Sequence, residues 1–301
     1  MVTIKNVAVV GAAGALGAPI LKAIVDSGKF SVTVVSRESS TSTFPSSVKV
    51  VKADYNSVDS LTTALKGQDA VVSAVGNEGF LAQTLLVDAA IAAGVKKFLP
   101  SEFGSDLSNP NTGKLAVFGH KIAVRKYIEE KVLAGADITY TYVINGGFLD
   151  WGLGVGFLLN WKEGKPELYN GGDREFSTTT LPAIGQAVVG VLSHYDETKN
   201  RSVYIQSRTV SQNHLLELAK KVAPEKTWNP VNVSTADVKK NSDEKLSKGE
   251  ITQAVMVGYI FVSIFDEAYG GRFEKLDNDL LGVPQATDAD VEAILKKLLV
   301  N

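Results

Sequence analysis

Residues 7–17 read VAVVGAAGALG, an apolar run that ends in a glycine-rich turn. A helical stretch follows, and a second apolar run from Ser31 to Val35 ends on Ser36 and Arg37. This order of strand, glycine turn, helix and strand is typical of the βαβ unit, in which a dinucleotide pyrophosphate binds at a helix N-terminus. The segment therefore predicts an α/β fold with a nucleotide site at its first turn.

The three glycines of this turn have different roles in such a site. Gly11 allows the tight turn, Gly14 lets the backbone approach a pyrophosphate, and Gly17 lets the helix pack closely on the strand. The alternative is a turn that uses glycine only for its backbone freedom. The GxxGxxG spacing favours the extended short-chain dehydrogenases over the two-domain dehydrogenases. The cofactor contacts predicted here are Gly11, Ala13, Gly14, Ala15, Leu16 and Gly17.

Arg37 indicates which dinucleotide binds. An NAD site usually carries an acidic residue at the end of the second strand, whereas an NADP site carries a cation for the 2′-phosphate. Here that residue is Arg37, and a cluster of hydroxyl side chains follows at residues 39–43. The alternative is a solvated arginine that pairs with Glu38. We therefore predict NADPH or NADP+ as the cofactor, with Arg37 at its phosphate.

Short apolar runs bounded by turn residues recur at residues 7–10, 31–35, 48–51, 70–74, 97–100 and 138–143. Continuous apolarity is what strands covered on both faces require, so the pattern predicts a Rossmann-type, doubly wound parallel sheet in a domain of residues 1–150. After residue 150 the rhythm breaks. Residues 151–301 predict a smaller, mostly helical substrate lobe, with some segments returning to the sheet and an isolated strand from Ser202 to Gln206.

The composition excludes several kinds of site. The 301 residues include no cysteine, and the three histidines lack the spacing of a helical metal pair, so no metal site is predicted. A net charge of -2 without a basic cluster, and the lack of an 18-residue apolar run, predict neither nucleic acid nor membrane as a partner. We expect a cytoplasmic monomer or homodimer that binds a small-molecule substrate.

Two further loops follow strands of the predicted sheet and should reach its carboxyl edge, where ligands bind. The first carries Ser73, Val75 and Gly76, which are expected beside the ribose and nicotinamide or are ordinary loop residues. The second follows the strand that ends at Pro100. There Glu102 either hydrogen-bonds the cofactor or braces the loop. The cofactor contacts predicted on this second loop are Ser101, Glu102 and Phe103.

Two lysines on the helix predicted from Val117 to Ala134 compete for a catalytic role. Tyr127 and Lys131 match the YxxxK pair of short-chain dehydrogenases, although so short a match is common by chance. At about 100° per residue, Lys121 is instead centred on the apolar stripe of the helix. A lysine on a buried face must be paired, desolvated or functional, unless it reaches along the core to water. Lys121 is therefore the predicted acid or base, and it is also a predicted cofactor contact.

Several of these segments together resemble the isoflavone reductase-like proteins of the NmrA-like group of atypical short-chain dehydrogenases, which includes phenylcoumaran benzylic ether and pinoresinol-lariciresinol reductases. The segments are the glycine turn, residues 36–39, Gln83 with its neighbours, residues 92–104 and the stretch around Lys121. The resemblance implies an NADPH-binding domain with Lys121 as the sole general acid or base. Residues 144–151 depart from the plant pattern and look more like fungal members.

The predicted function is an NADPH-dependent reductase of a small aromatic or conjugated substrate. Phe148, Trp151 and Phe157 are either walls for that substrate or ordinary core. The alternative function is an NmrA-like regulator that senses the redox state of NADP(H) without catalysis. A third interpretation, epimerase or dehydratase chemistry with tightly held NAD, would need an acidic residue where Arg37 stands.

Overall fold

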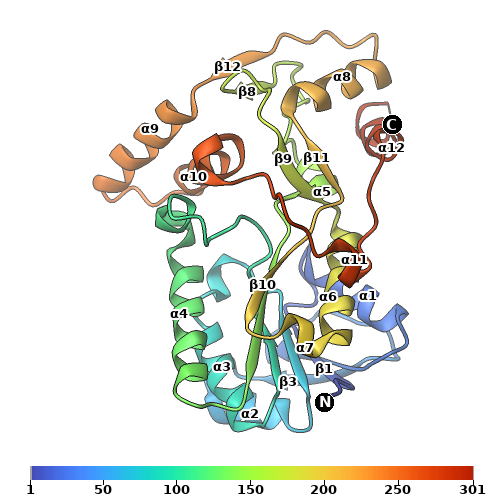
Figure 1. Cartoon of the computed structure of the whole chain (residues 1–301), viewed down its shortest axis with the longest axis vertical. Coiled ribbons are helices and arrows are strands. Elements are labelled where there is room, and N and C mark those ends of the chain that lie inside the picture. Colours follow the sequence, from blue (N-terminus) through green and yellow to red (C-terminus); the bar gives the residue numbers. More distant parts are fainter. Residues whose placement is uncertain (1, 301) are drawn as a thin grey trace.

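The computed structural model describes residues 2–300 and is built around a seven-stranded parallel sheet (Figure 1). The strand order is β10-β6-β5-β4-β1-β2-β3. Successive strands are added outward from β1 through β2 and β3 on one side and from β4 on the other, so the strand order switches between β1 and β4. The strands are β1 (Asn6–Val10), β2 (Ser31–Arg37), β3 (Lys49–Ala53), β4 (Ala70–Ser73), β5 (Lys97–Leu99), β6 (Thr139–Ile144) and β10 (Arg201–Tyr204). The predicted doubly wound fold is confirmed, and its carboxyl edge is where ligands are expected.

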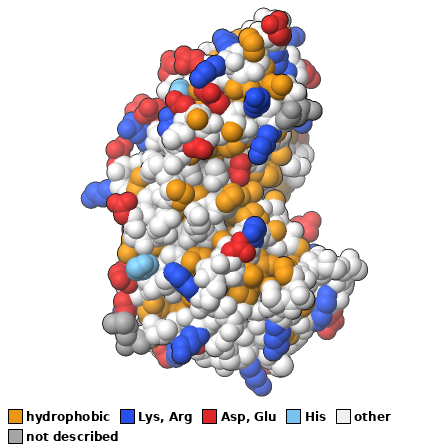
Figure 2. All heavy atoms as spheres, turned by 90° about the vertical axis from the view of Figure 1, so that its right-hand side faces the viewer, with side chains coloured by type: hydrophobic (Ala, Val, Ile, Leu, Met, Phe, Trp, Pro, Cys, Tyr) orange, Lys and Arg blue, Asp and Glu red, His pale blue; other side chains and the backbone are white. Residues whose placement is uncertain are grey.

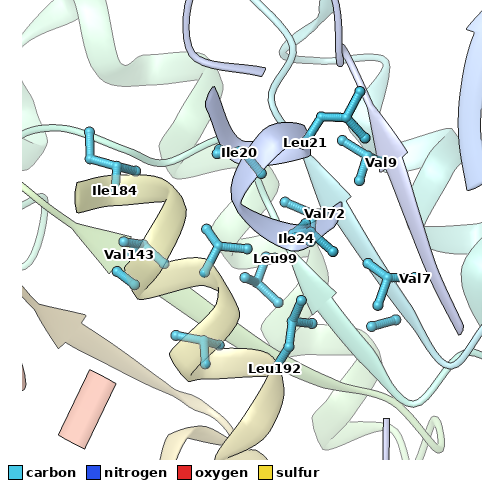
Figure 3. Close-up of a cluster of buried hydrophobic side chains, with 14 of the residues drawn as sticks. Val7, Val9, Ile20, Leu21, Ile24, Val72, Leu99, Val143, Ile184 and Leu192 are labelled. Atoms are coloured by element: carbon cyan, nitrogen blue, oxygen red, sulfur yellow. The ribbon is translucent and has the colours of Figure 1, made fainter. Parts of the chain in front are cut away.

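Helices cover both faces of this sheet, as continuous apolar strands require. On one face lie α1 (Gly17–Asp26) and α6 (Leu181–Ser193), and on the other α2 (Val58–Leu65), α3 (Gln83–Ala92) and α4 (Gly119–Leu133). Figure 3 shows the first layer, with Ile20 and Ile24 of α1 beside Val72 and Leu99 of the sheet. These side chains are fully buried, so α1, α6 and this face of the sheet share one core, and the helices of the opposite face form a second.

The C-terminal half adds a lobe above the sheet (Figure 1). Its core is a separate cluster of buried side chains centred on Leu153, Phe176, Leu215 and Phe265. Small sheets accompany its helices: β11 and β9 are antiparallel, β7 joins β9 in parallel, and β12 pairs with β8. Its elements are β7 (Gly147–Phe148), α5 (Leu149–Gly154), β8 (Glu167–Tyr169), β9 (Phe176–Thr179), β11 (Arg208–Val210), α8 (Gln212–Val222), β12 (Val231–Val233), α9 (Thr235–Ser247), α10 (Gln253–Phe265) and α12 (Asp288–Leu299).

One strand prediction was wrong. The strand expected in isolation at residues 202–206 is β10, and it pairs in parallel with β6 as the edge of the main sheet. The connection runs through α6 and the short helix α7 (Tyr195–Thr198), and α11 (Asn278–Leu281) packs on α6 from the far end of the chain. Of the four residues in β10 only Val203 is fully buried, because an edge strand has one neighbour. Apolarity alone therefore could not assign it to the sheet.

Helix boundaries differ from expectation where short 3-10 turns flank a helix. The helix expected from Val117 begins at Gly119, after a 3-10 turn at Ala116–Phe118. Within residues 2–300 no helix combines the length and apolarity needed to cross a membrane.

Candidate active site

The glycine turn between β1 and α1 has the geometry that its sequence predicts. Gly11 has a φ of +79°, and a Cβ atom there would lie 2.5 Å from the carbonyl oxygen of Ala74. A Cβ at Gly17 would collide with the carbonyl oxygen of Gly11. At Gly14 the nearest atom to such a Cβ is 3.4 Å away, so the fold itself tolerates a side chain there. Gly11 and Gly17 are thus needed for the turn, whereas Gly14 keeps the space beside it open.

A pocket of about 530 Å³ opens beside this turn at the carboxyl edge of β1, β2 and β4. Its volume lies within the usual range of small-molecule sites, roughly 300–1,000 Å³. Six of the predicted cofactor residues line it: Gly11, Ala13, Gly14, Arg37, Val75 and Gly76. The structure therefore brings the first turn, the end of β2 and the loop after β4 to one site.

Two aromatic residues that sequence reasoning missed also line this pocket, Phe44 and Tyr55. The Tyr55 hydroxyl donates a 2.7 Å hydrogen bond to the carbonyl oxygen of Val35, and burial raises the pKa of Tyr55 to about 12 against the opposing charge of Arg37. Both aromatics come from segments without a recognisable motif. Their only signal is that each follows a strand or loop bound for the same edge of the sheet.

Two cations, one lining the pocket and one beside it, form no ion pair with a carboxylate in the part of the chain that the structure describes. Arg37 is exposed and lines the pocket, and no ion pair to it, including one from Glu38, is formed among residues 2–300. Lys52 of β3 lies next to it, because its ammonium donates to the carbonyl oxygens of Arg37 (3.4 Å) and Ser40 (2.5 Å). Lys52 was not predicted, since it becomes a neighbour only through the pairing of β2 with β3. Two uncompensated cations favour an anion at this point.

A hollow of about 980 Å³ lies elsewhere, on the outer face between α1, α6 and α11. Figure 2 shows this side of the molecule, where hydrophobic side chains gather across the middle. The hollow shares no lining residue with the glycine-turn pocket and contains none of the predicted site residues. The smaller pocket is therefore the candidate site.

Other predicted contacts hold loops instead of lining this pocket. Ser73 is fully buried, and the Ser101 hydroxyl donates to the carbonyl oxygen of Val75 at 2.7 Å. The Ser101 N–H donates to Oε1 of Gln83 at 2.8 Å, and Gln83 Nε2 donates to the carbonyl oxygen of Phe80. Gln83 thereby ties together the loops that follow β4 and β5. Ala15 and Leu16 directly precede α1 and Gly17 begins it, and none of the three lines the pocket.

Lys121 lies at the far side of the loop after β4. Its ammonium donates to the backbone carbonyl oxygen of Glu102 and lies 5.2 Å from the ring centroid of Phe80, the residue after the pocket-lining Gly79. Desolvation lowers the pKa of Lys121, the charge of Glu102 opposes this, and the charge of Arg125 adds to it. The ammonium is therefore in a setting where it can release its proton more readily than a lysine in water.

Glu102 does not line the glycine-turn pocket. It is buried and forms a 2.7 Å ion pair with the guanidinium of Arg125 on α4. The next residue, Phe103, has a φ of +29° and is buried in the core beside α1. Of the two roles considered for Glu102, bracing the loop is the one that its side chain performs here.

The YxxxK match lies on a different part of α4. The Tyr127 hydroxyl donates to Asp88 of α3 at 2.6 Å, and the Lys131 ammonium pairs with the same carboxylate at 2.7 Å. Neither residue lines the glycine-turn pocket, and His120 is exposed on the helix. The pair links α3 to α4.

The three predicted substrate aromatics form a row at the entrance to the C-terminal lobe. Ring centroids are 6.1 Å apart for Phe148 and Trp151, and 6.3 Å apart for Trp151 and Phe157. The row continues to Phe261 of α10, whose centroid lies 4.8 Å from that of Phe157. Trp151 is 41% exposed, whereas Phe157 packs on the buried cluster of the lobe. Trp151 is thus the member with a free face.

The sequence is similar to known proteins over most of its length. A model of the NmrA-like family matches residues 3–258. "Oxidoreductase poxI" of Penicillium oxalicum is 32% identical over 299 residues, covering 95% of this chain and 92% of the relative. "Bifunctional pinoresinol-lariciresinol reductase 2" of Thuja plicata is 32% identical over 256 residues, covering 77% and 80%. The fungal relative thus matches nearly the whole chain.

A solved structure described as "AtPrR2 with NADP+ and (+)pinoresinol" superposes with a TM-score of 0.78 at 24% identity, covering 99% of both chains. At this identity the likeness establishes the fold, including the lobe above the sheet.

Proposed function

The chain belongs to the NmrA-like family, and from that premise we propose that it is an NADPH-dependent reductase of a small aromatic or conjugated molecule. The observation that carries the proposal is the Lys121 ammonium, which is held by the Glu102 carbonyl beside Phe80, next to the loop that forms the glycine-turn pocket. The similarity to proteins named as oxidoreductases supports the reaction class.

The glycine-turn pocket fits a dinucleotide. Gly14 leaves open the space that a side chain would fill, and α1, whose N-terminus has no side-chain cap, begins beside this space, where a pyrophosphate would be favoured. Arg37 and Lys52 would hold the 2′-phosphate, and Phe44 and Tyr55 would pack against the adenosine half. When bound, NADPH supplies the hydride.

Lys121 is the proton carrier in this proposal. Its ammonium is fixed by one hydrogen bond to a backbone carbonyl, so the remaining N–H groups are free to face a substrate oxygen. Because desolvation lowers the pKa of Lys121, giving up a proton near neutral pH costs less than it would in water. The residue therefore donates to, or accepts from, the oxygen whose charge changes as the substrate is reduced.

The C-terminal lobe, which begins with Phe148 of β7 and with α5, forms the substrate side. Trp151 presents an exposed ring in the aromatic row, and flat aromatic substrates stack favourably on such rings. The pinoresinol named for the similar structure is itself aromatic, which supports this substrate class.

The test is NADPH oxidation, followed by absorbance, across a library of aromatic ketones, enones and benzylic ethers. Turnover of at least one library member, with NADPH preferred over NADH, is the expected result. A regulator without catalysis would oxidise no NADPH across the library and would retain one stoichiometric protein partner whose binding follows the redox state of the cofactor. That outcome would contradict the proposal.

A further inference from the structure

Lys121 and Arg125, one helical turn apart on α4, both bind Glu102 in the loop after β5. Lys121 donates to the backbone carbonyl oxygen of Glu102, and Arg125 pairs with the carboxylate of Glu102 at 2.7 Å. Residues four apart on a helix share one face, so both contacts with Glu102 come from the same face of α4. The Glu102 N–H donates back to the carbonyl oxygen of Pro100 at 2.7 Å. The position of the Glu102 carbonyl therefore depends on how firmly the side chain is held.

The ion pair is buried. The side chains of Glu102 and Arg125 are 2% and 10% exposed. On its other side the guanidinium lies 4.4 Å from the ring centroid of Tyr142, whose hydroxyl donates to Glu129. A buried charge needs a partner, because leaving it alone costs several kcal/mol. Because the Glu102 carboxylate is paired with Arg125, it does not form an ion pair with the nearby Lys121 ammonium.

The turn itself needs such support. Phe103, directly after Glu102, has a φ of +29°, a backbone conformation that is strained for a non-glycine residue. Such strain persists only when the surroundings hold it, here through the buried Phe103 ring on one side and the Glu102–Arg125 pair on the other. Loosening the pair would let the turn relax and move the carbonyl that orients Lys121.

We propose that Arg125 is a positioning residue, which holds the Glu102 carboxylate away from the Lys121 ammonium and fixes the strained turn whose carbonyl oxygen orients that ammonium. The proposal deepens the role of Lys121 in the proposed function and rests on it for its relevance to catalysis. The groups that act on Lys121 electrostatically are Glu102, with opposite charge, and Arg125, with like charge.

If Arg125 and Glu102 act on Lys121 in this way, removing one charge or the other should shift the pKa of Lys121 in opposite directions. A purely structural role of the pair would not produce opposite shifts. Removing the Glu102 charge leaves Arg125 alone beside Lys121, which lowers the pKa of Lys121 further. Removing the Arg125 charge frees the Glu102 carboxylate to pair with the ammonium, which raises this pKa. A charge within about 4–6 Å shifts a pKa by about one unit or more. Removing both charges returns the pKa toward its starting point.

The experiment is an NMR titration of the lysine Cε signals in protein labelled with carbon-13 lysine, without cofactor or substrate. The Lys121 signal is assigned with Lys121→Arg. The variants are Glu102→Gln, Arg125→Gln and the double variant, and the matched control is Lys126→Gln, which removes an exposed charge from the next position of α4. Circular dichroism establishes that each variant is folded.

The expected result is a midpoint about one pH unit lower in Glu102→Gln and about one unit higher in Arg125→Gln, with the double variant and the control near wild type. Equal midpoints in all variants, or shifts of both single variants in one direction, would overturn the proposal. Should Arg125→Gln fail to fold, Glu102→Gln and the double variant decide, since the double variant buries no unpaired charge. Because the titration needs no turnover, its outcome is separate from any failure of the proposed reductase activity.

Discussion

Lys97 gives a stability prediction whose size follows from the structure. Lys97 is the first residue of β5, an inner strand of the main sheet, and its side chain is fully buried. Its ammonium donates to the Thr198 hydroxyl at 2.8 Å and to the carbonyl oxygen of Tyr195 at 3.4 Å, and among residues 2–300 it forms no ion pair with a carboxylate. Burial lowers the pKa of Lys97 from 10.5 to about 7; the charge of Arg201 adds to this, and those of Asp196 and Glu197 oppose it.

The sign follows from which state holds the proton. The folded pKa of Lys97 is below its unfolded value, so between these two values the unfolded chain binds a proton that the folded protein has released. The stability contribution is therefore greatest above the unfolded pKa of 10.5, falls as the pH is lowered toward about 7, and levels off below it. With 1.36 kcal/mol for each pKa unit, lowering the pH from 9 to 7 costs the folded state about 2 kcal/mol.

Urea unfolding at these two pH values measures this term in wild type, Lys97→Met and the control Lys96→Met, whose lysine is paired with Asp137 at the surface. Wild type and the control should gain about 2 kcal/mol from pH 7 to pH 9 relative to Lys97→Met. Lys97→Met should also be the most stable at pH 7, because a Met fills similar space without a charge. The same pH dependence in wild type and Lys97→Met would refute the reasoning.

The remaining predictions concern the glycine-turn pocket. Arg37→Gln should weaken NADPH binding roughly 10- to 100-fold and leave NADH binding unchanged in fluorescence titrations, because a charge-assisted hydrogen bond contributes about 1.5–3 kcal/mol; equal NADPH affinity would remove Arg37 from the phosphate site. Gly17→Ala should lower the free energy of unfolding by at least about 1–3 kcal/mol, since its methyl group meets the Gly11 carbonyl. Gly14→Ala should keep wild-type stability in the same urea assay but lose NADPH affinity; a destabilised Gly14→Ala would mean that the open space serves the fold instead of a ligand.

The sequence predicts well what depends on neighbours along the chain. The βαβ unit is local, so the turn at Gly11 and its place before α1 follow from residue order alone. Helix periodicity likewise separates Lys121 from Lys131, and the structure has these lysines against Glu102 and Asp88 respectively. Both inferences need only the regular geometry of one element.

What depends on pairing between distant segments could not be predicted. Lys52 approaches the Arg37 loop only because β3 lies beside β2, and β10 joins the sheet from more than 50 residues beyond β6. Glu102 was placed at the right edge of the sheet, but the direction of its side chain depends on Arg125, which lies on another element. The sequence of a strand predicts at which edge of the sheet the following side chain lies. It does not predict which residue of another element that side chain contacts.

The central claim is that Lys121 carries the proton in an NADPH-dependent reduction, and a comparison of Lys121→Met with wild type tests it most directly. NADPH affinity and the rate of a single turnover are measured with a substrate from the library, and Lys131→Met, which alters the lysine paired with Asp88, is the control. We expect unchanged NADPH affinity and a rate lowered by about 100-fold or more in Lys121→Met, with a normal rate in Lys131→Met. A wild-type rate in Lys121→Met would contradict it.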